Sequence, residues 1–563
     1  MKKFFQIVIT AAACAWAFLI VTRHSVTHVS MLMVNGRIYT LDGHNSLVTA
    51  VAVTGNRITA AGTDEELRSR YSADTVIDLG GKTVLPGLID GHAHMAGLGQ
   101  LLQSVNLVGV SSPEEAVRRL KDRIPSIPRG AWVYGRGWDQ NLWPRKEFPT
   151  SAMLEHAADD NPVVLIRIDG HAIWVNKKAM ELAHISRATP DPDGGKIIRL
   201  PDGTPSGVFL DNARELIESF VPPPGPGEIE RSVLLAAEEC IRNGITEVCD
   251  MGIDAAGIEV YRRLAEEHRL PLRIYAAIIA PGPAWDSWKT KPPLIGEGDG
   301  MFTLRAVKMY IDGALGSRGA ALVDEYTDDP GNRGITINEK TLEPEARAGF
   351  SRGYQVCVHA IGDRGNHIVL DTYEKIARDI PIASLRPRIE HAQVLLPEDI
   401  ARFSAMKVLP SMQPVHATSD MYWAERRLGP ERIRGAYAWR SILSTGSLII
   451  GGSDFPNDRL SPIAGFYAAV TRSDADGYPA DGWYREQCMT REEAARCYTS
   501  WAAYGAFQES SKGSIEPGKL ADFTVLSSDI FQCPPRDILR TEIIMTIIDG
   551  RIVYSRPAEV RPG

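Results

Sequence analysis

Several histidines and one aspartate stand directly after short apolar runs of the sequence. His92 and His94 follow the run at 83–89, in the segment DGHAH, and an extended His-x-His turns both imidazoles to the same side of the chain. Two imidazoles placed in this way can hold one metal ion. Three further residues take the same position after an apolar run: His359, His391 and Asp454. The residue types and their positions predict a divalent metal site.

Short apolar runs alternate with longer amphipathic segments, which is typical of a parallel α/β sheet or barrel. The candidate strands are residues 83–89, 245–249, 272–278, 304–309, 355–358, 388–390, 408–412 and 448–451. Eight strands are what a TIM (β/α)8 barrel needs, and its active site is built at the C-terminal ends of the strands. A lone histidine at a strand end is more often structural. Because four histidines and an aspartate meet on one predicted rim, a metal site is the better interpretation.

Lys308 lies in the predicted strand 304–309, ahead of Asp312. A lysine in a buried strand must lose its charge or find a partner. One solution is carboxylation by carbon dioxide, which gives a carbamate able to bridge two metal ions. The alternative is an ion pair with Asp312 or another carboxylate.

Both ends of the chain show a different sequence pattern, which predicts short strands of alternating polarity separated by glycine turns. The strands are predicted at 31–34, 37–40, 49–53, 57–61 and 76–79, and again at 523–526, 543–548 and 551–554. The two ends could form one small β-sandwich domain from residues 30–84 and 510–563. Between them lies the barrel domain, 85–509, with an insertion at about 110–235.

The first 29 residues predict a signal anchor or a signal peptide. Lys2 and Lys3 precede an uncharged apolar run at 4–22, which as a hydrophobic helix spans about 28 Å and is long enough to cross a bilayer. The lysines would stay in the cytoplasm, so the rest is expected to be exported, membrane-anchored or periplasmic or extracellular. Small residues before Cys14 leave cleavage or lipidation open.

Composition and charge limit the classes of molecule that the protein is expected to bind. A hydrophobic share of 44% suits a folded protein with a large core, and a net charge of -8 without a basic run argues against nucleic acid. The seven cysteines show no paired spacing, so we expect no disulfide framework. The expected partners are a small-molecule amide substrate and the membrane, through the N-terminal segment only; a homodimer is compatible with the sequence.

The sequence resembles the amidohydrolase superfamily, in the amidohydrolase family 3 branch that contains N-substituted formamide deformylases. The resemblance covers about residues 30–555 and rests on ordered motifs, including LPGLIDGHAH, VKMYIDGALGSRGAAL, VHAIGDRGN, RIEHAQ, SMQPVHATSD and GGSDFP. It implies that both β-rich ends form one domain. It also implies a metal ligand set of His92, His94, Lys308, His359, His391 and Asp454. Zinc is the default ion for such ligands, with one or two ions per chain, although manganese, iron or nickel would also fit.

Substrate contacts are expected from polar or aromatic residues near the predicted rims. These are Trp138, Asp139, His171, Trp174, Arg318, Gln413 and His416. For each of them a structural role is an equal alternative. The chain departs from the branch at Asp211, where glutamate is expected, so its substrate preference could differ.

The expected reaction is hydrolysis of a carbon–nitrogen bond other than a peptide bond, in an N-formyl, N-acyl or cyclic amide, by a metal-activated water. Asp454 would carry the proton from water to the leaving nitrogen, with His391 and Lys308 as further catalytic residues. Two alternatives stay open. One is an amine deaminase on the same scaffold, which Lys308 disfavours. The other is a non-catalytic, membrane-tethered metal-binding or regulatory protein.

Overall fold

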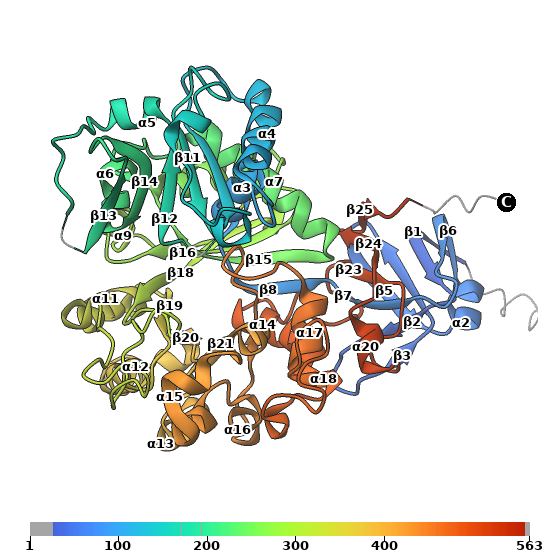
Figure 1. Ribbon diagram of the computed structural model, residues 1–563. Helices are drawn as coiled ribbons and strands as arrows, with labels where there is room; N and C mark the ends of the chain where they lie inside the picture. The colour runs from blue at the N-terminus through green and yellow to red at the C-terminus, as the bar shows by residue number, and fades with distance from the viewer. Residues whose placement is uncertain (1–25, 169, 193, 558–563) are drawn as a thin grey trace, which may run out of the picture. The chain divides into compact units, whose positions relative to one another are not determined.

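A computed structural model describes residues 26–168, 170–192 and 194–557, and eight parallel strands form its central feature (Figure 1). In spatial order they run from β8 through β15, β16, β18, β19, β20 and β21 to β22. Their bounds are β8 Leu88–Ala93, β15 Ile245–Ile253, β16 Arg273–Ile279, β18 Phe302–Tyr310, β19 Gln355–Ala360, β20 Arg388–His391, β21 Leu409–Met412 and β22 Ile450–Gly451. The predicted α/β barrel of the TIM type is confirmed.

Two backbone hydrogen bonds bring the last strand beside the first. The N–H of Asp454 donates to the carbonyl of His92 at 2.8 Å, and the N–H of His94 donates to the carbonyl of Phe455 at 2.9 Å. Helices follow the strands, for example α8 (Ala255–Glu266) after β15 and α12 (Asp363–Ala377) after β19. The barrel is therefore nearly closed, with the segments after β8 and β22 joined at one rim.

The predicted first strand, 83–89, is in fact two strands that belong to different sheets. β7 (Thr83–Pro86) joins a sheet outside the barrel, and β8 begins the barrel after Gly87. A Cβ atom on Gly87 would lie 2.4 Å from Oγ1 of Thr246, so only glycine fits this close approach. An apolar run gives no sign of such a change of sheet, because both halves are buried.

Strands from both ends of the described chain pair in one sheet, in the order β25-β24-β23-β7-β2-β3. A second sheet has the order β5-β4-β1-β6. The bounds are β1 Thr27–Val34, β2 Arg37–Tyr39, β3 Leu47–Val48, β4 Ala50–Thr54, β5 Arg57–Gly62, β6 Tyr71–Asp78, β23 Phe523–Leu526, β24 Ile543–Ile548 and β25 Arg551–Ser555. Both sheets contribute to one apolar cluster, with Met33 and Val51 from one and Val84 and Phe523 from the other.

Residues Met95–Ala236 form a compact unit of their own. Its sheet has the order β13-β14-β12-β11-β10-β9. The strands are β9 Val105–Asn106, β10 Val133–Trp138, β11 Val163–Arg167, β12 Ala172–Val175, β13 Gly195–Arg199 and β14 Pro205–Asp211. Trp138, Trp143 and Trp174 pack together in its apolar core.

The predicted hydrophobic N-terminal helix falls within residues 1–25 and lies outside the described residues. Within the part of the chain that the structure does describe, no helix combines the length and the apolar character needed to cross a membrane.

A buried ion pair joins the barrel to the sheet formed by the chain ends, and its loss should destabilise the fold. Arg273 begins β16, and its Nε atom donates to Oδ2 of Asp522 at 2.9 Å, with Asp549 as a further partner. We expect Arg273→Met to lower the free energy of unfolding by about 3–5 kcal/mol, because it leaves Asp522 buried without its cation. Urea unfolding measures this, and Arg540→Met, at an exposed pair, is the control and should have little effect.

The same pair predicts a dependence of stability on pH. Burial opposes ionisation of Asp522, but the charge and hydrogen bonds of Arg273 hold its pKa below the ordinary value of 3.8. A depressed folded-state pKa means that the contribution is present above the unfolded value and is lost as pH falls through the folded value. Arg273→Met should therefore remove part of the acid sensitivity, and an unchanged urea midpoint at neutral pH would contradict this assignment.

Candidate metal centre

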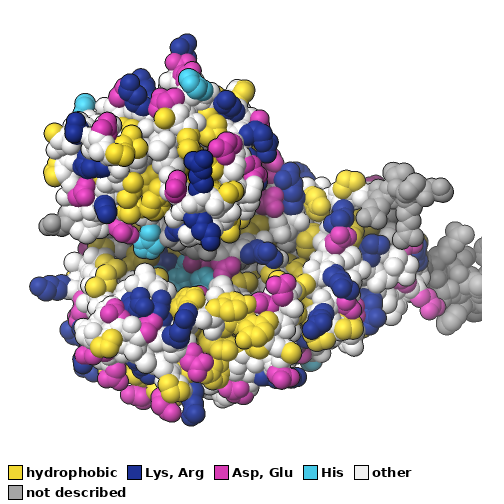
Figure 2. All heavy atoms as spheres, viewed as in Figure 1, with side chains coloured by type: hydrophobic (Ala, Val, Ile, Leu, Met, Phe, Trp, Pro, Cys, Tyr) yellow, Lys and Arg dark blue, Asp and Glu magenta, His cyan; other side chains and the backbone are white. Residues whose placement is uncertain are grey.

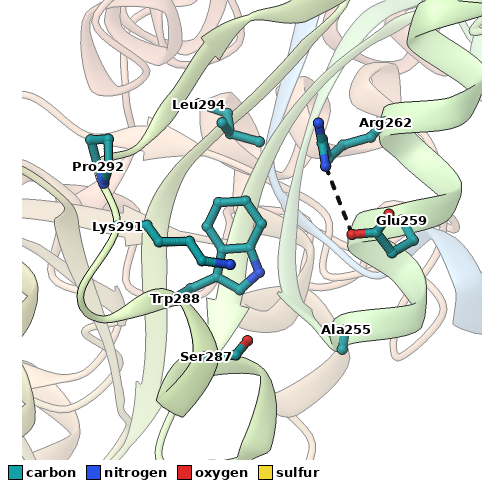
Figure 3. A pocket seen from close by; sticks show the side chains of 8 residues that line it. All are labelled: Ala255, Glu259, Arg262, Ser287, Trp288, Lys291, Pro292 and Leu294. Atoms are coloured by element: carbon teal, nitrogen blue, oxygen red, sulfur yellow. Dashed lines mark ion pairs between the residues drawn. The ribbon is translucent and has the colours of Figure 1, made fainter.

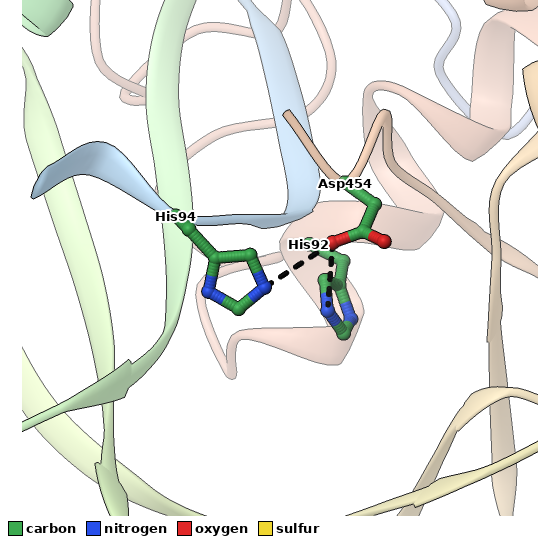
Figure 4. Close-up of side chains that lie close together, drawn as sticks. All are labelled: His92, His94 and Asp454. Atoms are coloured by element: carbon green, nitrogen blue, oxygen red, sulfur yellow. Dashed lines mark ion pairs between the residues drawn. The ribbon is translucent and has the colours of Figure 1, made fainter. Parts of the chain in front are cut away.

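The barrel rim brings together the residues that the sequence singled out as metal ligands. His92 and His94 come from the end of β8, and Asp454 comes from the segment after β22. Lys308, His359 and His391 belong to β18, β19 and β20. The close-up in Figure 4 shows the first three side chains pointing toward one another. Residues far apart in sequence thus share one site because parallel strands end at the same rim.

Asp454 is the shared member of two ligand groups. Its Oδ1 atom lies 3.2 Å from Nε2 of His94 and 3.6 Å from Nε2 of His92. Its Oδ2 atom lies 3.7 Å from Nε2 of His416, which forms the second group with His391 and Asp454. His416 was expected to contact substrate, and the structure places it beside the metal ligands. Burial opposes the charge on Asp454, yet its hydrogen bond with His94 and the nearby histidines hold its pKa well below the ordinary value.

A glycine lets the segment after β22 approach β8 closely enough to form this group. A Cβ atom on Gly452 would lie 2.6 Å from the backbone nitrogen of His92. Asp90 ties the same two segments together, because its Oδ1 accepts hydrogen bonds from the N–H groups of His92 and Ser453, both at 3.1 Å. Asp90 lies in the LPGLIDGHAH motif, and the sequence predicted no role for it.

The imidazoles of His92 and His391 each use one nitrogen for an orienting hydrogen bond. Nδ1 of His92 lies 2.6 Å from Oε2 of Glu390, and Nδ1 of His391 lies 2.8 Å from Oε1 of Gln413. Acceptors at Nδ1 leave Nε2 deprotonated and available to a metal. Burial lowers the pKa of His92 to about 3, and it also lowers the pKa of His391 well below the ordinary value. Both rings are therefore neutral, as metal ligands must be.

Glu390 contacts the candidate ligand His92, and the sequence predictions did not single it out. It is fully buried, and Arg388 of the same strand donates to it through Nε at 2.7 Å. Arg388 also donates to the carbonyl of Gly91 at 2.6 Å. The signal was present, since two charged residues at alternate positions of an apolar strand face the same side and must pair.

Lys308 is buried beside His92. Its Nζ atom lies 3.3 Å from Nε2 of His92 and 4.9 Å from the ring centre of Tyr310. Burial lowers the pKa of the ammonium group, against the attraction of Glu390 and Asp454. Asp312, the alternative partner, instead accepts hydrogen bonds from the backbone N–H groups of Ala321, Ile361 and Gly362 at 2.9, 2.9 and 2.7 Å.

The donor set fits a divalent metal ion. His359 lies beside His391, with ring centres 4.6 Å apart. Its Nε2 atom is buried and makes no hydrogen bond with the residues that the structure describes, although Oδ1 of Asp312 lies 3.7 Å away. Burying an unsatisfied polar atom is unfavourable, and coordination would satisfy it. Neutral imidazoles with one carboxylate are the ligands of catalytic zinc sites, so the residues present suit such an ion.

The predicted substrate residues between Met95 and Ala236 lie in their own unit. Trp138 and Trp174 are fully buried, and their indole N–H groups donate to the carbonyls of Leu165 and Thr150. This packing explains their burial without a ligand, and their contact with substrate stays a prediction.

Three other residues that were predicted to contact substrate have partners in the structure. Asp139 pairs with Arg167 at 2.9 Å. His171 pairs with Asp211, the residue at which the chain departs from its branch, at 3.0 Å. Arg318, in the loop after β18, donates to Asp328 at 3.1 Å. Their substrate contacts likewise stay predictions.

A cavity of about 450 Å³ lies between α8 and the segment that includes α9 (Pro283–Trp288), and the histidines do not line it (Figure 3). Arg262 is paired there with Glu259 at 3.8 Å and with Glu297 at 3.2 Å. Lys291 lies over the ring of Trp288, 4.5 Å from its centre. The cations of this cavity are engaged by neighbours, so the metal centre is the stronger candidate for chemistry.

Replacing Glu390 should weaken metal binding, because Glu390 orients the imidazole of His92. We expect Glu390→Gln to reduce metal affinity or kcat/KM by about 10- to 100-fold, because the variant keeps the shape but removes the charge that orients and polarises the imidazole. Competition with a chelator measures the affinity, and Glu398→Gln, at an exposed position of α13 (Pro397–Met406), is the control. Metal affinity equal to that of the parent protein would contradict this role.

The comparisons with known proteins agree with this geometry. A model described as the amidohydrolase family matches residues 75–554. The putative amidohydrolase YtcJ of Bacillus subtilis (strain 168) is 34% identical over 529 residues, covering 92% of this chain and 98% of that protein. N-substituted formamide deformylase of Arthrobacter pascens is 28% identical over 547 residues, covering 93% and 98%. An uncharacterized metal-dependent hydrolase from Pyrococcus horikoshii OT3 aligns with a TM-score of 0.75 and 26% identity, over 90% of this chain and 99% of that one. The chain therefore belongs to the amidohydrolase family of metal-dependent hydrolases.

Proposed function

We propose that the protein hydrolyses a carbon–nitrogen bond in a small, non-peptide amide, with N-formyl and N-acyl amines as the substrate class. The observation that carries this is the convergence of His92, His94 and Asp454 on one rim, with Asp454 in contact with both imidazoles. The similarity to N-substituted formamide deformylase supports the formyl group as the first substrate to test.

The proposed mechanism assigns the proton transfers to Asp454. A divalent ion, when bound, polarises the amide carbonyl and lowers the pKa of water to about 7. Asp454, held as a carboxylate, takes the proton of the attacking water and delivers it to the leaving nitrogen. Glu390 and Gln413 keep the imidazoles of His92 and His391 in their orientation. His391 assists in binding the carbonyl oxygen.

We further propose that zinc is the ion and that Lys308 is carboxylated and bridges two ions. The support is geometric, since Nζ of Lys308 is buried and lies 3.3 Å from Nε2 of His92, the nitrogen that would bind a metal ion. A free ammonium so close to metal cations would be repelled by them. As a separate proposal, the two sheets at the chain ends form a small β-sandwich domain that supports the barrel.

A screen tests the proposed function. Purified protein, loaded with zinc, is incubated with N-formyl and N-acyl amines, and released amine and bound metal are measured together. We expect turnover of at least one amide and its loss when a chelator removes the metal. Release of ammonia from aminated heterocycles, with no amide hydrolysed, would favour a deaminase instead.

Export is a separate proposal, supported by Lys2 and Lys3 ahead of an apolar segment that lies outside the described residues. We expect fractionation to find the full-length chain with the membrane or in the periplasm or medium, and a chain lacking residues 1–29 in the cytoplasm. A full-length chain found only in the soluble cytoplasm would refute this.

A further inference from the structure

A carboxylate that the metal ligand groups do not use lies one helical turn beyond His416. Asp420 ends α14 (Pro414–Asp420), and residues four apart lie on the same face of a helix. Its Oδ2 atom accepts hydrogen bonds from the hydroxyl of Tyr437 at 2.6 Å and from Nε2 of Gln393 at 3.1 Å. Gln393 follows His391 by two residues, so Asp420 is connected to the metal centre through two elements, α14 and the end of β20.

The position of this carboxylate is fixed by buried groups. Nε2 of Gln393 also donates to the hydroxyl of Tyr437 at 2.7 Å, which closes a triangle with Asp420. The carbonyl of Tyr437 in turn accepts a hydrogen bond from Arg472 at 3.0 Å. Arg472 is fully buried and lies 4.5 Å from the ring centre of Trp439. Asp420 is therefore held by a rigid network, unlike a mobile surface acid.

One oxygen of Asp420 accepts no hydrogen bond from the described residues. Both hydrogen bonds reach Oδ2, and no residue in the described part of the chain donates to Oδ1. The side chain is half-buried, and burial raises the pKa of the carboxyl group against the opposing effect of His416. A partly desolvated acceptor of this kind is unfavourable alone, and an N–H donor or an ammonium group would satisfy it.

Two exposed tyrosines form a stacked pair that begins two residues beyond Asp420 in the chain. Tyr422 and Tyr478 are 55% and 61% exposed and stack with ring centres 6.1 Å apart, and the hydroxyl of Tyr422 donates to Asp474. Aromatic faces and carboxylates both attract cations. Figure 2 shows hydrophobic side chains gathered over the region of α14 and α17 (Pro462–Thr471), which Figure 1 draws in orange.

We propose that Oδ1 of Asp420 binds an ammonium group of the substrate, so that the preferred substrates are N-formyl or N-acyl diamines. This rests on the proposed amide hydrolysis and adds to it the class of amine. The carboxylate acts as a binding group and takes no part in bond cleavage.

The test compares two formamides of similar size on the zinc-loaded, full-length protein. N-formyl-1,3-diaminopropane carries the ammonium group, and N-formylbutylamine is its neutral counterpart. We expect the parent protein to favour the cationic substrate in kcat/KM by at least about tenfold, since a hydrogen bond to a charged group is worth about that factor. Asp420→Asn should abolish this ratio through KM, with bound zinc unchanged. Asp379→Asn, which makes the same chemical change at an exposed aspartate outside this network, is the matched control and should keep the ratio.

A second variant and a binding measurement keep the two proposals apart. Asp420→Glu retains the charge but extends the side chain by one methylene. The preferred substrate should therefore have a shorter carbon chain between its two nitrogen atoms, as in N-formyl-1,2-diaminoethane. Calorimetry with 1,3-diaminopropane should show binding to the parent protein and at least about tenfold weaker binding to Asp420→Asn. If both formamides are hydrolysed with the same ratio by the parent and by both variants, the role of Asp420 is refuted while amide hydrolysis stands. If no amide is hydrolysed, the proposed function fails, and the calorimetry alone decides whether Asp420 binds the amine.

Discussion

Replacing Asp454 with asparagine should reduce kcat/KM for amide hydrolysis by at least about 10²- to 10⁴-fold, the range expected when a general acid–base group is lost. Asparagine has nearly the same shape, so the packing around it is kept. Its amide cannot accept the proton of the attacking water or return it to the leaving nitrogen. The variant also lacks the charge that faces Nε2 of His94 at 3.2 Å and Nε2 of His92 at 3.6 Å, so bound metal should fall as well.

Two measurements on the same sample check this expectation. Steady-state kinetics gives kcat/KM, and elemental analysis gives the metal content per chain. Asp476→Asn is the matched control, because it makes the same chemical change at an exposed aspartate. Near-normal turnover with full metal content in Asp454→Asn would overturn the assignment of the site. The double variant His92→Ala, His94→Ala should lose metal and turnover together.

The second large effect is expected at Lys308. If its carbamate bridges two ions, the parent protein should hold about two metals per chain, as two-metal hydrolytic sites do at separations near roughly 4 Å. Lys308→Ala should lose at least one of them, and kcat/KM should fall by at least about 100-fold, the upper range for losing an orienting or bridging group. A short carboxylic acid such as acetate or propionate should partly restore both values by standing in for the carbamate.

The dependence on carbon dioxide separates a carbamate from an ordinary lysine. Metal-free protein reconstituted with bicarbonate should take up more metal than protein reconstituted without it, and Lys308→Ala should not show this difference. Lys340→Ala, at an exposed position, is the control. A single metal that Lys308→Ala retains with near-normal turnover would make the lysine structural and the site mononuclear.

The barrel strands could be predicted from the sequence because the pattern that marks them is local. An apolar run between polar turns marks a buried strand wherever the strand pairs, and seven of the eight predicted runs overlap a single barrel strand. The exception is the run 83–89, which divides at Gly87 between two sheets. Burial on both faces looks the same in the sequence whether a segment continues in one sheet or passes to another.

The candidate site likewise has members that the sequence predicted and members that it did not. The sequence placed His92, His94, His359, His391 and Asp454 at strand ends, and the parallel arrangement of the strands brings them together without further information. It could not show that His416 joins Asp454, because that contact depends on how the helix after β21 is oriented.

The supporting contacts were decided by the tertiary structure alone. Glu390 reaches His92 across 298 positions of sequence, and its partner Arg388 reaches the carbonyl of Gly91. These contacts form because the closed barrel excludes water, so the buried polar side chains must make their hydrogen bonds with one another or with the backbone. The sequence by itself therefore determined which candidate metal ligands stand at strand ends and share one rim. Which neighbours orient these ligands was decided only by the folded barrel. A buried charged group needs a partner, and the closed barrel determines which partner lies within reach.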